Sequence, residues 1–185
     1  MRRILIDDHI VDARACSYGL PWDSDGMCYN FKMPDECILP SDIAQISDTA
    51  DIEALVIGCD LDSYDFISDM TNLNSLYIYK GNNVTSLDFV RNLTELNQFY
   101  ISGSHISDIS PFLSLLAKKE KLMAIDSHSI RSLYLILRGI YIESDCEIAE
   151  NDIRKLSHSR AFGYDLIIKS SSDNTTGDTY VISYG

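Results

Sequence analysis

The chain has 185 residues, of which 45% are hydrophobic, and its formal net charge is −13. This length and hydrophobic content suffice for one ordinary core and predict a single domain over residues 1–185. The negative charge argues against nucleic acid as a partner, because contact with a phosphate backbone needs a basic surface. No apolar run reaches the roughly 18 residues of a membrane-spanning helix, so we expect no membrane partner.

The start of the chain, its cysteines and the distribution of its charge indicate where the protein is located and what it binds. The start of the chain has charged residues but neither a long apolar stretch nor a cleavage site, so it does not resemble a signal peptide. Five cysteines without a CxxC pair indicate a reduced, cytoplasmic protein. Residues 1–70 carry fifteen acidic and only four basic residues. Such an acidic half suits a basic protein partner, although solubility alone explains it equally well.

Residues 1–45 predict an irregular N-terminal cap. Short strands are expected near Ile4–Ile6 and Tyr29–Lys32, and prolines and glycines interrupt the segment between them.

Residues 46–169 contain a pattern that recurs about every 22 residues and is clearest over residues 52–113. Each unit begins with a short strand whose apolar residues alternate, and then returns through a second apolar segment. Such a period indicates a stack of repeats, an architecture that binds more often than it catalyses. The three clearest strand patterns are Ile52-x-x-Leu55-x-Ile57, Leu73-x-x-Leu76-x-Ile78 and Leu96-x-x-Phe99-x-Ile101.

The third unit continues as Ser104-x-Ile106-Ser107-Asp108-Ile109-Ser110-Pro111-Phe112. This pattern resembles the leucine-rich repeat family, and within it the bacterial 22-residue (internalin-like) type. The resemblance implies an α/β fold, a leucine-rich-repeat solenoid with a curved parallel sheet and with short helices or turns on its convex side. It also implies protein binding on the concave sheet. The asparagine of the family's turn is replaced here by Asp60, Gly81 and Ser104.

The repeats become irregular after residue 113. We expect six parallel strands that start near residues 54, 75, 98, 121, 139 and 165, and helix-like spacing over 111–121, 130–137 and 147–157. Residues 170–185 predict a C-terminal hairpin and cap, in which a polar loop leads to an antiparallel strand that closes the sheet edge.

A column of large side chains is predicted on the concave face. Side chains alternate across a strand, so the residue between two inward positions faces the other side of the sheet. Large aromatic residues there indicate a protein-binding stripe. Two alternatives stay open, namely a plain preference of such residues for strands and a C-terminal tail that covers the stripe. The candidate partner-binding residues of this column are Val56, Tyr77, Tyr100, Met123 and Tyr141. The neighbouring row adds Tyr79 and Glu143, and the acidic half of the chain adds Asp60 and Asp62.

The sequence contains no known catalytic or metal-binding motif. A serine beside a histidine in sequence is not a nucleophile–base pair, since the two must meet in space with an orienting group. The spacing of Cys16, Cys28 and Cys37 does not fit the usual zinc fingers, and Trp22–Gly26 lacks the later acidic ligand of a calcium loop. We therefore expect no enzyme, no cofactor and no metal. The candidate catalytic bases in this argument are the four histidines His9, His105, His128 and His158.

The sequence thus predicts a non-catalytic leucine-rich-repeat protein that binds another protein through its concave sheet and acidic N-terminal half. One alternative is an immunity or inhibitor protein that blocks the active site of a basic toxin or nuclease. A second alternative is a structural or self-associating module, and the oligomeric state stays open.

Overall fold

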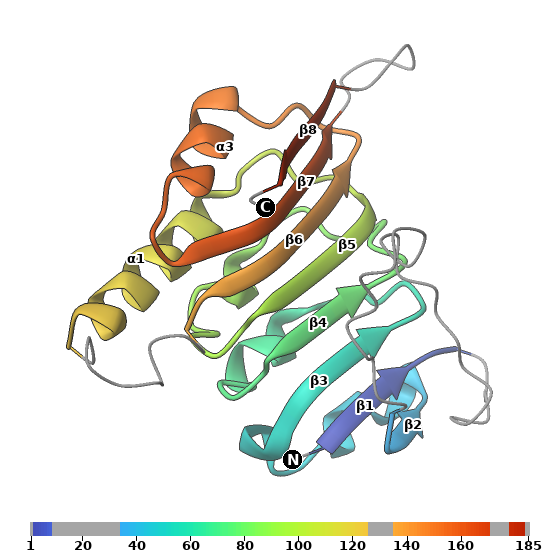
Figure 1. Cartoon of the computed structure of the whole chain (residues 1–185). Helices are drawn as coiled ribbons and strands as arrows, with labels where there is room; N and C mark the ends of the chain where they lie inside the picture. Colours follow the sequence, from blue (N-terminus) through green and yellow to red (C-terminus); the bar gives the residue numbers. More distant parts are fainter. Residues whose placement is uncertain (1, 9–33, 126–134, 171–177, 184–185) are drawn as a thin grey trace.

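A computed structural model describes residues 2–8, 34–125, 135–170 and 178–183. The described strands form one open sheet in the order β2-β1-β3-β4-β5-β6-β7-β8 (Figure 1). All neighbouring pairs are parallel except β7 and β8, which are antiparallel. The strands are β1 Arg2–Ile6, β2 Glu36–Ile38, β3 Ile52–Ile57, β4 Ser75–Ile78, β5 Gln98–Ser104, β6 Leu137–Ser144, β7 Phe162–Ser170 and β8 Asp178–Ser183.

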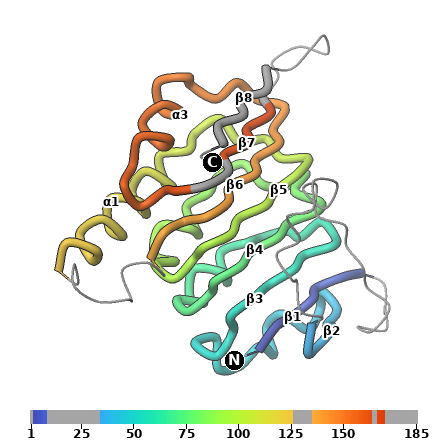
Figure 2. The backbone as a smooth tube through the Cα atoms, viewed as in Figure 1, coloured from blue at the N-terminus to red at the C-terminus, as the bar shows by residue number. Residues whose placement is uncertain are grey.

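From β3 to β8 the chain adds one strand after another to the same side of the sheet. The colour order of Figure 2 shows this from β3 to β7. The connections carry short helices. These are η2 Pro40–Gln45, η3 Thr49–Asp51, η4 Asp65–Asp69, η5 Asp88–Val90, α1 Ser110–Ile125 and α3 Glu150–Ser157, where η denotes a 3-10 helix. No helix in the described part of the chain is long and apolar enough to cross a membrane.

The main core lies between one face of the sheet and the helices. Leu55, Leu76 and Phe99 occupy one register position on adjacent strands and have no exposed surface. Ile140 and Leu166 continue this row on β6 and β7. A second buried row, two residues further along each strand, consists of Ile57, Ile78, Ile101, Ile142 and Ile168. The structure therefore confirms the predicted alternation, in which these apolar side chains face the core.

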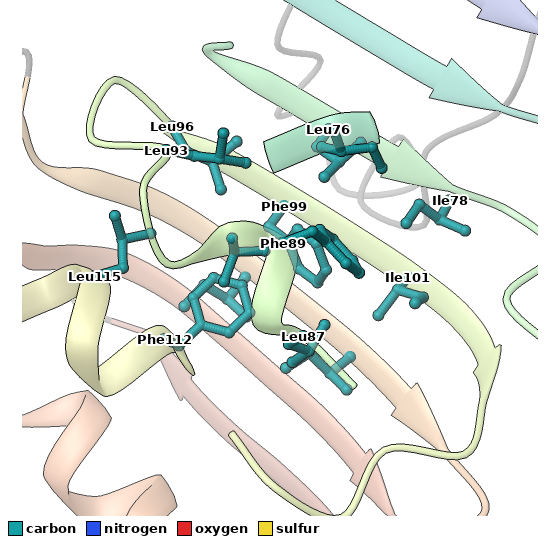
Figure 3. Close-up of a cluster of buried hydrophobic side chains, with 14 of the residues drawn as sticks. Leu76, Ile78, Leu87, Phe89, Leu93, Leu96, Phe99, Ile101, Phe112 and Leu115 are labelled. Carbon is teal, nitrogen blue, oxygen red and sulfur yellow. The ribbon is translucent and has the colours of Figure 1, made fainter. Parts of the chain in front are cut away.

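The helices close this core from the other side (Figure 3). Phe112 of α1 meets Phe99 of β5 edge to face, with ring centroids 4.8 Å apart. Phe89 of η5 and Leu115 of α1 are buried in the same cluster. Fully burying a side chain of this size contributes roughly 1.5–3 kcal/mol relative to exposure, so the core rows account for a large share of the stability.

The prediction of a strand near residue 121 is wrong, because residues 110–125 form the helix α1. The motif Leu122-x-Ala124 is too short to distinguish a strand from one face of a helix. Strong helix formers surround it, and Pro111 stands in the first helical turn, where proline is tolerated. Met123 accordingly lies on α1, half-buried against the main core, and not in the concave column.

The two ends of the chain differ in how they match the predictions. The predicted strand Ile4–Ile6 is confirmed as part of β1, but β1 joins the main sheet next to β3. The predicted strand Tyr29–Lys32 lies outside the described residues. The C-terminal hairpin is confirmed, with Ile167 of β7 opposite Val181 of β8. The expected helices over 111–121 and 147–157 correspond to α1 and α3. Of the expected helix over 130–137, residues 130–134 lie outside the described residues, and Leu137 is the first residue of β6.

Candidate functional site

The predicted column lies on the sheet face opposite the helices. Of its predicted members, Val56, Tyr77, Tyr100, Tyr141 and Ile167 occupy one register position, and Met123 does not. The structure extends this row with Leu5 of β1 and Cys37 of β2, which were not predicted. Val56 and Tyr77 are each 2% exposed, Tyr141 is 4% exposed and Tyr100 is 7% exposed. The column is therefore a second buried hydrophobic cluster, and it is not an open stripe.

The tyrosines of this cluster pack on one another. The rings of Tyr100 and Tyr141 stack with centroids 4.6 Å apart, and the ring of Tyr79 lies 5.0 Å from that of Tyr100. Lys169 Nζ lies 5.4 Å from the ring centroid of Tyr141, within the range of a cation–π contact. Burial raises the pKa of the Tyr100 hydroxyl. These contacts make Tyr100 and Tyr141 structural residues of the sheet.

Four residues of the predicted partner-binding set lie outside the buried column and are accessible to solvent. Asp60 and Asp62 are exposed, and Tyr79 and Glu143 are half-buried. They follow, or lie at, the carboxyl ends of β3, β4 and β6. Parallel strands end at the same sheet edge, and ligands of open α/β sheets commonly bind there. We name this part of the surface the carboxyl edge, defined by Asp60, Asp62, Tyr79, Asn82, His105, Glu143 and Asp145.

The alternative in which the C-terminal tail covers the stripe concerns residues 171–177, 184 and 185. These residues lie outside those that the structure describes.

The carboxyl edge is held together by side-chain hydrogen bonds between successive units. Asp60 accepts hydrogen bonds from the backbone N–H of Asn82 at 3.1 Å and from Asn82 Nδ2 at 2.9 Å. In the next interval, His105 Nδ1 lies 2.6 Å from Asp145 Oδ1. This hydrogen bond lowers the pKa of the Asp145 carboxyl, which keeps it ionised. These hydrogen bonds therefore hold the carboxylates of Asp60 and Asp145 in fixed positions.

A groove of about 470 Å³ opens between the ends of β5 and β6. The pairing of these strands shifts there, so that the step from Ile101 to Ser104 lies opposite the step from Ile142 to Ser144. The extra residue is accommodated at Gly103, whose φ of 71° favours glycine. The groove, here called the β5–β6 groove, is lined by Asn82, Ser102, Gly103, Ser104, His105, Glu143, Ser144 and Asp145.

The hydroxyl groups of the groove are not arranged for nucleophilic catalysis. Ser102, Ser104 and Ser144 donate hydrogen bonds to the backbone carbonyls of Tyr79, Glu143 and Ile106 at 2.8–2.9 Å. Among the described residues, none of the three donates a hydrogen bond to His105, although a nucleophile must reach its base. Burial and the adjacent Asp145 raise the pKa of the Cys146 thiol, which disfavours the reactive thiolate. The arrangement fits binding better than covalent chemistry.

The carboxyl edge and the opposite sheet edge differ in how their charges are paired. At the amino ends of β1 and β2, Arg2 bonds Glu36 at 2.8 Å and Arg3 bonds Asp35 at 2.6 Å. These arginine hydrogen bonds lower the pKa of both carboxyl groups. Within the described ranges, no lysine or arginine forms an ion pair with Asp60, Asp62 or Glu143. These three carboxylates therefore lack the direct arginine partners of the opposite edge, and Glu143 feels only the longer-range charge of Lys169.

The remaining candidates from the sequence do not assemble into a site. In the described part of the chain, no group of three or more metal-binding side chains comes together. His158 caps the end of α3, with Nδ1 2.7 Å from the carbonyl of Arg154. The other predicted candidates, namely His9, His128, Cys16, Cys28 and the segment Trp22–Gly26, lie outside the described residues.

Asn82 and Asp145 of the edge and Gly103 of the groove were not selected from the sequence. Asp145 stands three residues beyond Ile142, the place that Asp60 takes after Ile57, so superposing the units would have identified it. Asn82 lies one position beyond the equivalent residue, Gly81, and this comparison would not have found it.

No protein-family model, curated protein or solved structure matches the chain.

Proposed function

We propose that this protein is a non-catalytic binding module of the leucine-rich-repeat type. The support is the repeated placement of buried residues. In-register rows such as Leu55, Leu76 and Phe99 recur at intervals of 21 and 23 residues and face short helices across the core. Stacked repeats of this kind supply extended surfaces for binding.

The proposed ligand is a basic protein, and the proposed contact surface is the carboxyl edge. The observation that carries this proposal is that Asp60, Asp62 and Glu143, at one edge of the sheet, form no ion pair with a lysine or arginine of the described residues. Like charges gathered on one surface accelerate association with an oppositely charged partner and disfavour wrong partners. Tyr79, half-buried beside them, adds an aromatic contact of the kind enriched in interfaces.

Inhibition of a basic toxin or nuclease is the sharper form of this proposal. An acidic surface of this kind suits a partner whose active site is basic, because such a site is built to attract negative phosphate groups. Binding of the carboxyl edge to that active site would then exclude the partner's substrate.

The test is affinity capture of partners from the organism that makes the protein, with elution by a salt gradient and identification by mass. We expect a basic protein that is released as the salt concentration rises, since screening weakens contacts between exposed charges. The purified partner is then assayed for nuclease or other toxic activity with and without this protein. A partner that is neutral and resists salt would contradict the proposal. A mass that rises with protein concentration, without any partner, would instead favour self-association.

A further inference from the structure

The β5–β6 groove has an unequal balance of side-chain hydrogen-bond donors and acceptors. Its three serine hydroxyls all donate to backbone carbonyls of the protein. Asn82 Nδ2 donates to both oxygens of Asp60, at 3.1 and 2.9 Å. In the tautomer in which His105 Nδ1 carries the proton, that N–H donates to Asp145. The side-chain donors that line the groove are thus engaged inside the protein.

The side-chain acceptors of the groove are not engaged in the same way. Among the described residues, the Glu143 carboxylate has no hydrogen bond or ion pair, and Asp145 uses Oδ1 for its contacts with His105 and Cys146. Asn82 Oδ1 and, in the tautomer above, His105 Nε2 also remain as acceptors. The groove therefore offers a ligand several acceptors, of which two are carboxylates.

We propose that the β5–β6 groove binds the guanidinium group of an arginine side chain, supplied by the basic partner of the carboxyl edge. A guanidinium carries five N–H donors in a plane and no acceptor, which complements a groove whose side chains offer acceptors. It also holds its charge at every physiological pH, and it bonds carboxylates through paired N–H groups. A metal ion fits less well, because no three metal-binding side chains gather in the described part of the chain.

The surroundings of the groove support a cationic ligand of this shape. Lys169, the cation nearest to Glu143 on β7, lies over the ring of Tyr141 and forms no ion pair with Glu143. The half-buried ring of Tyr79 belongs to the same face as Glu143, and guanidinium groups stack on aromatic rings. Among the described residues, the half-buried Glu143 carboxylate forms no hydrogen bond and feels only the longer-range charge of Lys169, so it is the group that an incoming arginine would satisfy most directly.

This inference rests on the proposed function, because it names the side chain that the partner contributes. The direct probe is a short peptide, acetyl-Gly-Arg-Gly-Arg-Gly-amide, with matched peptides that carry citrulline or lysine in place of arginine. Citrulline keeps the shape of arginine and removes its charge. Affinities are measured by calorimetry near pH 8, where imidazole is neutral, and backbone NMR signals locate the bound peptide.

We expect the arginine peptide to bind about tenfold more tightly than the citrulline peptide, with signal changes at Gly103 and Asp145. Glu143→Gln and Asp145→Asn should each weaken the arginine peptide about threefold to tenfold. The matched control is Asp69→Asn on η4, which removes one exposed carboxylate outside the groove and should leave the affinity unchanged.

Equal binding of the arginine and citrulline peptides would overturn the inference, as would equal effects of Glu143→Gln and Asp69→Asn. Lysine binding as tightly as arginine would contradict the assignment of a guanidinium. If any of these contradicting results is obtained while a basic partner still binds through Asp60 and Asp62, only the inference of an arginine site fails. If no basic partner binds the protein at all, the proposed function fails with it.

Discussion

Lys119 places an ammonium group in the interior of the protein. Its side chain has no exposed surface, and Nζ donates hydrogen bonds to the carbonyls of Thr94 at 2.7 Å and Leu135 at 2.9 Å. Among the described residues, no carboxylate accepts a hydrogen bond from it, and burial lowers its pKa to about 8. The charged form is therefore disfavoured in the folded protein.

This burial predicts a stability that depends on pH. The lysine pKa in an unfolded chain is about 10.4, so between that value and about 8 the unfolded state binds more protons than the folded state. Stability contributed by Lys119 should consequently rise with pH in this interval and stay constant below it. We expect the free energy of unfolding, measured with urea, to gain more than about 1 kcal/mol between pH 7.5 and pH 9.5 relative to the variant Lys119→Met. Parallel pH profiles of the two proteins would contradict the buried ammonium.

Tyr100 provides a second test at the level of single residues. Because its ring is 7% exposed and packs against Tyr79 and Tyr141, we expect Tyr100→Ala to lower the free energy of unfolding by about 3–5 kcal/mol. Tyr79→Ala removes a half-buried ring and should cost less than about 2 kcal/mol. Both values come from urea unfolding. A cost below 1 kcal/mol for Tyr100→Ala would mean that the column is open to solvent.

At the scale of elements, α1 joins three segments through consecutive side chains. Lys118 Nζ bonds the carbonyl of Arg91, and Lys119 reaches Thr94 and Leu135. Glu120 Oε1 accepts hydrogen bonds from Ser159 Oγ at 2.6 Å and from the backbone N–H of Arg160 at 2.9 Å. The helix thus connects the unit before it with the segment between α3 and β7.

Glu120→Ala should therefore loosen the joint between α1 and β7. Loss of the acceptor leaves the Arg160 N–H without its partner, so we expect a cost of about 1–2 kcal/mol in unfolding free energy. Hydrogen exchange at the Arg160 amide should accelerate locally, whereas the Ile101 amide in β5 should keep its protection. Glu120→Gln retains an acceptor oxygen and should lose less. Uniform acceleration across all strands would show that the effect is global.

The elements also show what the sequence could and could not predict. Alternation in Leu55-x-Ile57 and its equivalents predicted the face of every repeat strand, because a side-chain period of two is a local property. A helix was predicted over 111–121, but a strand was predicted for the residues that end this helix. The pattern Leu122-x-Ala124 is too short to distinguish a helix from a strand. Burial of Tyr77 and Tyr100 could not be predicted, because alternation assigns a face but does not say whether that face is covered.

At the scale of the whole molecule, the sheet separates two kinds of edge. Arginines neutralise carboxylates at the amino ends of β1 and β2, and the carboxyl edge lacks such pairs among the described residues. The excess of acidic residues was evident from the sequence. The parallel fold brings acidic residues from distant units to one edge, since Asp60 and Asp145 lie on the same side although they are 85 positions apart.

The most direct test of the account compares the affinity of the purified partner for three proteins. These are the unchanged protein, the carboxyl-edge variant Asp60→Asn/Asp62→Asn, and the matched variant Asp51→Asn/Asp69→Asn, which removes two exposed carboxylates elsewhere. At low salt we predict binding at least about fivefold weaker for the edge variant, unchanged binding for the matched variant, and a smaller difference at high salt. Equal weakening by both double variants would show that net charge, and not the carboxyl edge, governs binding.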